Sequence, residues 1–193
     1  IAAEHDLTPN GVYETKLREL QTTLMEDDCF LPWRERPIPE LSSNATLNAS
    51  TGDPAPLRNG VDRPVAEEDN GWTGKMESSV EYRFQTAAQL SEARFVFDSD
   101  LNRMDDSRGH TARNMRHYFA LDATHWAVPG TMIKAFRVEL QDAAGKWHVT
   151  HREENNYQRL VRVPLKDSAT AVRFIPEATW GAETAHVFAF DVR

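Results

Sequence analysis

The sequence predicts a mainly β fold, a β-sandwich or barrel, on three observations. Apolar and polar residues alternate with a period of two in about eight or nine short runs after residue 43. No run of helical periodicity lies between these runs, which is typical of all-β sandwiches and barrels. With 193 residues, of which 40% are hydrophobic, the chain is long enough to bury a core between two sheets.

The predicted strands are short and regularly patterned. Seven of them are centred on residues 80–84, 93–97, 115–119, 136–140, 160–163, 172–174 and 186–192. Between two of them, the segment 141–145 ends in Gly145 and predicts a β-hairpin turn. Two long polar stretches, 51–79 and 99–114, interrupt the strands. Loops of this length in a compact domain are usually functional or firmly held, so we expect one of these roles for them.

An α-helix is predicted near the N-terminal end. Thr8 is a suitable N-cap, and Pro9 suits the first helical position, where its missing N–H is not needed. An apolar stripe then recurs at steps of three and four residues, through Val12, Tyr13, Leu17, Leu20 and Leu24. Acidic residues follow this stripe, and the helix dipole disfavours negative charge at the C-terminal end of a helix. The helix is therefore expected to end near Asp27. We therefore divide the chain into a helical extension, residues 1–40, and a β-sandwich, residues 41–193.

Composition and missing motifs exclude several functions. The chain has 22 Lys and Arg against 30 Asp and Glu residues, a net charge of −8, which argues against binding nucleic acid or an anionic membrane surface. No apolar run approaches the roughly 18 residues of a membrane helix. Neither the dinucleotide nor the P-loop glycine motif is present. Cys29 is the single cysteine, and its apolar neighbours indicate a buried structural thiol. We expect no catalytic residue in this chain.

Metal ligands are the first candidates for a site. His148 and His151 are the closest pair of histidines, but an i, i+3 pair on a strand points to opposite faces, so we interpret both as surface residues. Asp53 and Asp62, with the carbonyl groups of residues 59–60, offer oxygen ligands for calcium within one loop. The loop lacks the regular spacing of an EF-hand. A calcium site at Asp53 and Asp62 is therefore only a hypothesis.

A carbohydrate site is the second candidate. Trp72 and Trp180 lie in glycine-containing loop segments, and an aromatic ring with a few polar groups around it is what a sugar site needs. The candidate binding residues at one end of the sandwich, where the two long polar stretches meet, are Asn70, Trp72, Arg113, Asn156 and Trp180. The alternative, which we favour, is that Trp72 closes the core and that Asn156, with Arg159, ties its loop to the sheet.

Two groups of motifs resemble a known family. Residues 8–14, Thr-Pro-Asn-Gly-Val-Tyr-Glu, lead to residues 19–32, where Glu-Leu-Gln-Thr-Thr-Leu precedes Asp-Asp-Cys-Phe-Leu-Pro. This is similar to the end of the flavin domain in bacterial FAD-dependent oxidoreductases, a family also known under the name xanthan lyase. Further segments resemble that family's C-terminal galactose-binding-like, discoidin-type domain: residues 45–50, 59–72, 155–159, 171–174 and 185–190. One departure is Ala189, where the family has an acidic residue.

The resemblance implies a galactose-binding-like jelly-roll β-sandwich with an N-terminal α-helix that completes a preceding flavin domain. FAD is expected in the parent protein but not in this chain, because the FAD fingerprint would lie upstream of Ile1. We expect the chain to be a piece of a longer bacterial protein, from either cytoplasm or periplasm. The expected partners are the flavin domain, a carbohydrate, and a second copy of the chain paired through the apolar helix stripe.

These features favour a non-catalytic C-terminal accessory domain of a FAD-dependent oxidoreductase, either structural or carbohydrate-binding. The alternative is a polysaccharide lyase or glycosidase that acts on an anionic polysaccharide through the carboxylates of residues 67–69 and 105–106. The sequence offers no acid–base spacing that supports this alternative.

Overall fold

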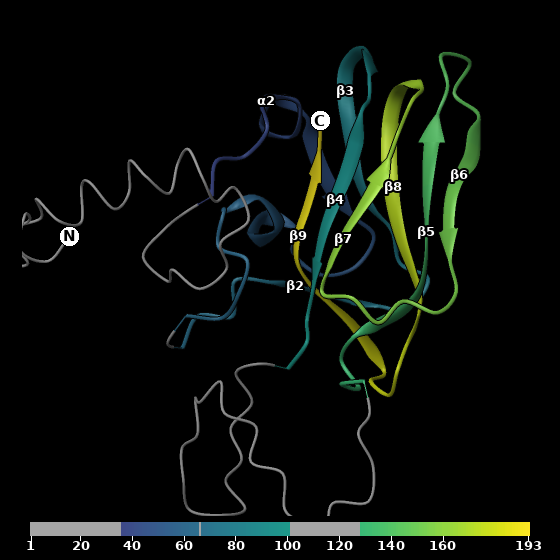
Figure 1. Ribbon diagram of the computed structural model, residues 1–193. Helices are drawn as coiled ribbons and strands as arrows, with labels where there is room; N and C mark the ends of the chain where they lie inside the picture. The colour runs from purple at the N-terminus through teal and green to yellow at the C-terminus, as the bar shows by residue number, and fades with distance from the viewer. Residues whose placement is uncertain (1–35, 66, 101–127) are drawn as a thin grey trace, which may run out of the picture.

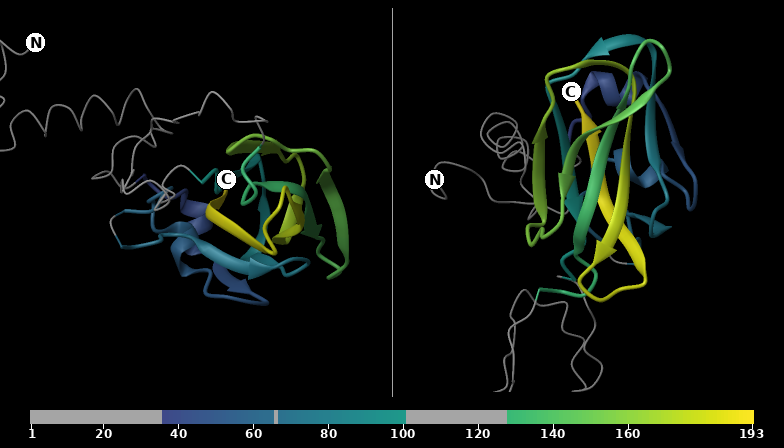
Figure 2. Two further views of the ribbon diagram at one scale, coloured as in Figure 1. Left: turned by 90° about the horizontal axis from the view of Figure 1, so that it is seen from below. Right: turned by 90° about the vertical axis from the view of Figure 1, so that its right-hand side faces the viewer.

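The computed structural model describes residues 36–65, 67–100 and 128–193. In this part of the chain, nine β-strands form two antiparallel sheets that pack face to face (Figures 1 and 2). The short helix α2 (Glu40–Asn44) precedes the first strand, and the 3-10 helix η1 (Ala55–Arg58) follows it. The predicted β-sandwich is confirmed. Its strands are β1 (Thr46–Ala49), β2 (Trp72–Lys75), β3 (Val80–Gln89), β4 (Glu92–Phe97), β5 (Ile133–Gln141), β6 (Trp147–Glu153), β7 (Leu160–Pro164), β8 (Ser168–Thr179) and β9 (Thr184–Val192).

The chain passes repeatedly from one sheet to the other. The five-stranded sheet has the order β1-β3-β8-β5-β6, and the four-stranded sheet has the order β2-β9-β4-β7. Most neighbours are not consecutive in sequence, as in other antiparallel sandwiches. The hairpin predicted at 141–145 joins β5 to β6. Its turn is closed by the Asp142 N–H, which donates to the Lys146 carbonyl at 3.0 Å, and Gly145 supplies a left-handed φ of 81°.

A cluster of aromatic rings fills the space between the sheets. Phe95 of β4 lies at its centre, with ring centroids 4.9 Å from Phe190, 5.0 Å from Phe174 and 5.6 Å from Phe136. All four side chains are buried. Their inward direction follows from the period-two pattern by which these strands were predicted. Burial of each phenylalanine contributes about 1.5–3 kcal/mol, so this cluster is a main source of the sandwich's stability.

Strand β4 differs from the predicted alternation. The pattern predicts an exposed Arg94, but its side chain is only 7% exposed, and Val96 is buried as well. The physical reason is that Arg36 and Asp62, which lie before α2 and after η1 in the chain, contact the outward side chains of β4 and β9, so this part of the four-stranded sheet is buried on both faces. Helix η1 lies against β9 and β2, and the Ser42 hydroxyl of α2 donates to the Val192 carbonyl at 2.9 Å.

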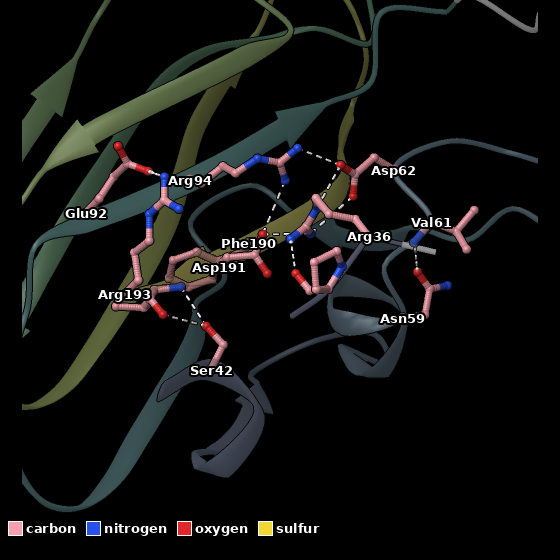
Figure 3. A network of polar contacts seen from close by, with 12 residues as sticks. Arg36, Ser42, Asn59, Val61, Asp62, Glu92, Arg94, Phe190, Asp191 and Arg193 are labelled. Carbon is pink, nitrogen blue, oxygen red and sulfur yellow. Dashed lines mark hydrogen bonds and ion pairs between the residues drawn. The ribbon is translucent and has the colours of Figure 1, made fainter. Parts of the chain in front are cut away.

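A buried network of four charged side chains holds the segments that carry Arg36 and Asp62 on the four-stranded sheet (Figure 3). Arg94 of β4 donates to Asp62 at 2.6 Å and to Asp191 of β9 at 3.2 Å. Arg36 contacts the same two carboxylates, at 3.2 Å and 2.7 Å. The four side chains are between 2% and 9% exposed. Two guanidinium groups and two carboxylates therefore neutralise one another out of contact with water.

The electrostatic balance of the network depends on every member. Burial raises the pKa of Asp191, and the positive charges of Arg36 and Arg94 act against that rise. One oxygen of Asp191, Oδ1, has no hydrogen-bond partner. Removal of either arginine would leave a buried carboxylate with too little compensation, which is far more costly than loss of an exposed ion pair.

The backbone also closes around this network. The Arg36 N–H donates to the Gly60 carbonyl at 2.8 Å. Gly60 has a φ of 81°, and a Cβ atom there would lie 2.4 Å from the Arg36 carbonyl oxygen. Residues 36–40, which the sequence assigns to the helical extension, thus contact the sandwich through Arg36.

Several predicted features lie outside the described residues. They are the N-terminal helix with its apolar stripe, Cys29, the strand at 115–119 and residues 101–114 of the second polar stretch. The two-part division of the chain and the pairing of two copies through the helix stay predictions.

The network generates the first prediction. The substitution Arg94→Met should lower the free energy of unfolding by about 3–5 kcal/mol, because it leaves Asp62 and Asp191 buried beside a single arginine. Urea denaturation measures this loss. The control Arg162→Met removes an arginine of neighbouring strand β7 whose ion pair with Glu92 is partly exposed, and it should cost no more than about 1 kcal/mol. Equal losses for both variants would show that the network does not stabilise the fold as described.

Candidate functional site

Several loops meet at one end of the sandwich, the lower end in Figure 1, where β8 turns into β9. The Trp180 N–H of this turn donates to the Met132 carbonyl at 3.1 Å, and the Ala182 N–H donates to the Gly130 carbonyl at 2.9 Å. Arg159, in the loop before β7, contacts both long polar stretches: it donates to the Asp62 carbonyl and, at 3.2 Å, to the Ser99 hydroxyl. Arg159 thus lies between one residue of each stretch, and because residues 101–114 lie outside the described ranges, the meeting of the two stretches stays a prediction.

Trp180 is a partly exposed aromatic residue at this end. Its side chain is in the β8–β9 turn and is 37% exposed. The indole Nε1–H donates to the Asn156 carbonyl at 2.7 Å, which fixes the ring. The ammonium group of Lys134 lies 4.9 Å from the ring centroid. Tyr157, next to Asn156 in the β6–β7 loop, is 66% exposed. The end of the sandwich thus offers an oriented, partly exposed indole with an ammonium group over its ring.

Asn156 holds this arrangement together. Its backbone N–H donates to the Lys134 carbonyl at 2.8 Å, and its side-chain amide donates to the Ile133 carbonyl at 2.8 Å. The side-chain oxygen accepts the Gln158 N–H at 3.0 Å. With the bond to Trp180 added, Asn156 uses its backbone and side-chain polar groups within the protein. The predicted role in tying the loop to the sheet is confirmed, and Asn156 positions Trp180.

Trp72 lies in the core. It is fully buried, and its Nε1–H donates to the Thr51 carbonyl at 2.8 Å. Gly74 packs so closely against the indole that a Cβ atom there would lie 2.0 Å from ring atom Cζ2. The interpretation that Trp72 closes the core is confirmed. A buried ring has no free face on which a sugar could stack, so Trp72 acts through packing.

The remaining predicted site residues are dispersed. Asn70 lies in its own loop, where its side-chain oxygen accepts from the Asn59 side-chain amide at 2.9 Å. The Asp53 carboxylate accepts the Ala55 N–H at 3.0 Å. Both oxygens of Asp62 face guanidinium groups of the buried network, and that positive charge opposes a calcium ion at the same position. Arg113 lies outside the described residues.

A second cluster at this end was not predicted. His186 of β9 lies between two carboxylates: Nδ1 is 2.9 Å from Asp98 at the end of β4, and Nε2 is 3.1 Å from the more exposed Asp69. Its ring packs edge-on against Phe188, with centroids 4.7 Å apart. Asp98 and Asp69 lie 88 and 117 positions before His186 in the sequence, so no local motif could reveal the cluster. It links the first long stretch to the sheet.

The protonation of His186 follows from this geometry. A neutral imidazole has one N–H, whereas two carboxylates at hydrogen-bond distance require both nitrogens to donate. Burial alone would lower the pKa of His186, but the hydrogen bonds and negative charges of Asp98 and Asp69 outweigh it and raise the pKa above its usual range. Conversely, burial would raise the pKa of Asp98, but the hydrogen bonds from His186 and from the Asp100 N–H, together with the positive charge of His186, outweigh it and lower the pKa.

Metal ligation, polysaccharide cleavage and membrane insertion each need residues of a particular kind. Among residues 36–65, 67–100 and 128–193, no group of three or more His, Cys, Asp or Glu side chains is arranged to hold a metal ion. Of the carboxylates named as candidates for polysaccharide cleavage, Asp69 is paired with His186, and residues 105–106 are not described. In the part of the chain that the structure describes, no helix is both long and apolar enough to cross a bilayer.

Comparison with known proteins identifies the fold. No protein-family model matches the chain, and no curated protein matches it. Among solved structures, a fucose-binding module from Streptococcus pneumoniae, SpX-3, has a TM-score of 0.56 at 10% identity, over 81% of this chain and 98% of that chain. The family 32 carbohydrate-binding module of Streptococcus pneumoniae EndoD has a TM-score of 0.55 at 13% identity, over 79% and 97%.

A third similar structure is the family 32 carbohydrate-binding module of C. perfringens NanJ in complex with galactose. Its TM-score is 0.51 at 10% identity, over 79% of this chain and 95% of that chain. At such identities the likeness shows the fold alone. The predicted galactose-binding-like jelly-roll sandwich is confirmed, and the flavin oxidoreductase parent stays a prediction.

The His186 cluster generates a prediction about pH. Because its pKa is raised in the folded state, His186 should stabilise the fold fully below its unfolded pKa of about 6.5 and lose this contribution as the pH rises through the folded pKa. Melting temperatures of the wild type and of His186→Asn should therefore differ most at low pH and converge at alkaline pH. His148→Asn, which removes an exposed histidine of β6, should show no such convergence. A difference between wild type and His186→Asn that stays constant from pH 5 to 9 would contradict the doubly bonded imidazolium.

Proposed function

We propose that this chain is a carbohydrate-binding accessory domain and that its ligand site is the loop end around Trp180. The observation that carries the proposal is the exposed, hydrogen-bonded indole of Trp180 at the end of the sandwich. The solved structures of similar fold that are named for a sugar, the fucose-binding and galactose-bound modules, add support for this class of ligand.

The chemistry of Trp180 fits contact with a sugar ring. Its polar atom, Nε1, is already bonded to the Asn156 carbonyl, so the exposed part of the indole is apolar. A pyranose ring has an apolar face of C–H groups that packs on such a surface, while its hydroxyl groups stay in contact with water or polar neighbours. Because Asn156 fixes the indole before binding, little side-chain entropy is lost when a ligand is bound.

We also propose that the larger protein is a FAD-dependent oxidoreductase. The support for this parent is the resemblance of residues 8–14 and 19–32 to the end of a flavin domain. A glycine-rich dinucleotide fingerprint in the coding sequence upstream of Ile1 would support the parent, and an upstream region without one would contradict it.

Binding measurements test the carbohydrate proposal. A glycan array should show binding to galactose- or fucose-terminated glycans, and titration calorimetry with the glycan that binds should show a loss of at least about tenfold for Trp180→Ala, because a central aromatic contact carries much of the binding energy. Trp147→Ala is the matched control. Trp147 lies on the outer face of β6 under the Arg173 guanidinium, 4.1 Å from its ring centroid, and its loss should leave binding unchanged.

A scaffold role would give a different result. If no glycan binds the wild type and Trp180→Ala lowers the melting temperature by several degrees, Trp180 serves packing alone and the carbohydrate proposal is wrong. If Trp147→Ala, and not Trp180→Ala, abolishes binding, the ligand site lies on the five-stranded sheet.

A further inference from the structure

Lys134 is the cation closest to the exposed aromatic ring. It is the second residue of β5, and its Nζ lies 4.9 Å from the Trp180 ring centroid. Its backbone carbonyl accepts the Asn156 N–H, so the start of the side chain is fixed by the same residue that fixes Trp180. Within the described ranges, no carboxylate forms an ion pair with this ammonium group.

Two other polar groups beside Trp180, its own indole N–H and the Asn156 side chain, are already bonded within the protein. The indole N–H donates to Asn156, and the Asn156 side chain is occupied by Ile133 and Gln158. An ammonium group has three donors and no acceptor. The charged group next to the stacking surface therefore favours a ligand that presents acceptor oxygens, most strongly an anionic one.

We propose that the loop end prefers an acidic sugar residue, a uronate, whose carboxylate draws Lys134 from its contact over the Trp180 ring and pairs with it, while the sugar ring packs on the indole. This inference rests on the proposed carbohydrate-binding function and names the class of sugar within it. The whole chain carries a net charge of −8, so long-range attraction does not bring an acidic glycan to the protein. The preference arises from the short-range contact with Lys134, which lies beside an apolar ring where water screens charge less than at an open surface.

A matched pair of ligands tests the preference. Galactose and galacturonate oligosaccharides of equal length and linkage differ at C6, which is a hydroxymethyl group in one and a carboxylate in the other. Titration calorimetry in about 0.15 M salt should show tighter binding of the oligogalacturonate to the wild type by about threefold to tenfold, the range from a partly exposed ion pair to a charge-assisted hydrogen bond.

Two substitutions of Lys134 separate charge from shape. Lys134→Met keeps the length of the side chain and should remove the preference while binding of the neutral oligogalactose persists. Lys134→Arg keeps the positive charge and should retain most of the preference. Lys146→Met is the control for net charge, because Lys146 is exposed in the β5–β6 turn at the other end of the sandwich (Figure 1). It should leave the preference unchanged.

The outcomes distinguish the two proposals. If the wild type binds the neutral ligand through Trp180 with no preference for the acidic one, the uronate inference is wrong and the carbohydrate-binding function stands. Persistence of the preference in Lys134→Met would also overturn the inference. If the wild type binds neither oligosaccharide and no glycan on the array, both proposals fail.

Discussion

Four buried charges hold the N-terminal part of the described chain against the sandwich. They belong to Arg36, Asp62, Arg94 and Asp191. Without Arg36 and Asp62, the four-stranded sheet would present Arg94 and Asp191 on a solvent-facing surface, as an ordinary sandwich presents its outward polar residues. With them, Arg94 and Asp191 are buried, and the segments that carry Arg36 and Asp62 are held on the outer face of this sheet. Compared with a well-packed apolar layer, such a network adds little to the free energy of unfolding, but removal of any one of its members is strongly destabilising. It therefore specifies which segments are held on the sheet more than it adds stability.

The same outer face of β9 carries the contacts that organise the loop end. Asp191 binds the arginines, Phe188 packs beneath the Arg159 guanidinium at 5.2 Å from its ring centroid, and His186 bonds to Asp98 and Asp69. These contacts connect the loop before β2 to the end of β4 and to the loop before β7. The loops near Trp180 are thus held in place by charge pairs. A loop end that is fixed before binding suits a ligand site of preformed shape.

Sequence patterns predicted the parts of the structure that depend on local periodicity. The inward rows of β3, β5 and β8, and the β5–β6 hairpin, follow from alternation and turn chemistry. The burial of Arg94 was not predicted, because it depends on Arg36 and Asp62, which come from a distant segment.

The tryptophans show the same limit of sequence patterns. Trp72 and Trp180 have similar glycine-containing surroundings in sequence, yet Gly74 packs against a buried Trp72 while Asn156 orients an exposed Trp180. No sequence pattern marks Lys134, because its role depends on the Trp180 ring that lies next to it only in the folded structure.

Native-state hydrogen exchange tests most directly whether the segments around Arg36 and Asp62 form one cooperative unit with the sandwich. The amides to compare are that of Arg36, which donates to the Gly60 carbonyl, that of Val61, which donates to the Asn59 side-chain oxygen, and that of Phe95 in the core strand β4. If the buried charges make these segments part of the folded unit, all three amides should exchange through openings whose free energies agree within about 1 kcal/mol. Exchange of Arg36 and Val61 through an opening several kcal/mol less costly, with Phe95 still protected, would contradict the account, because the segments would then detach while the sandwich stays folded.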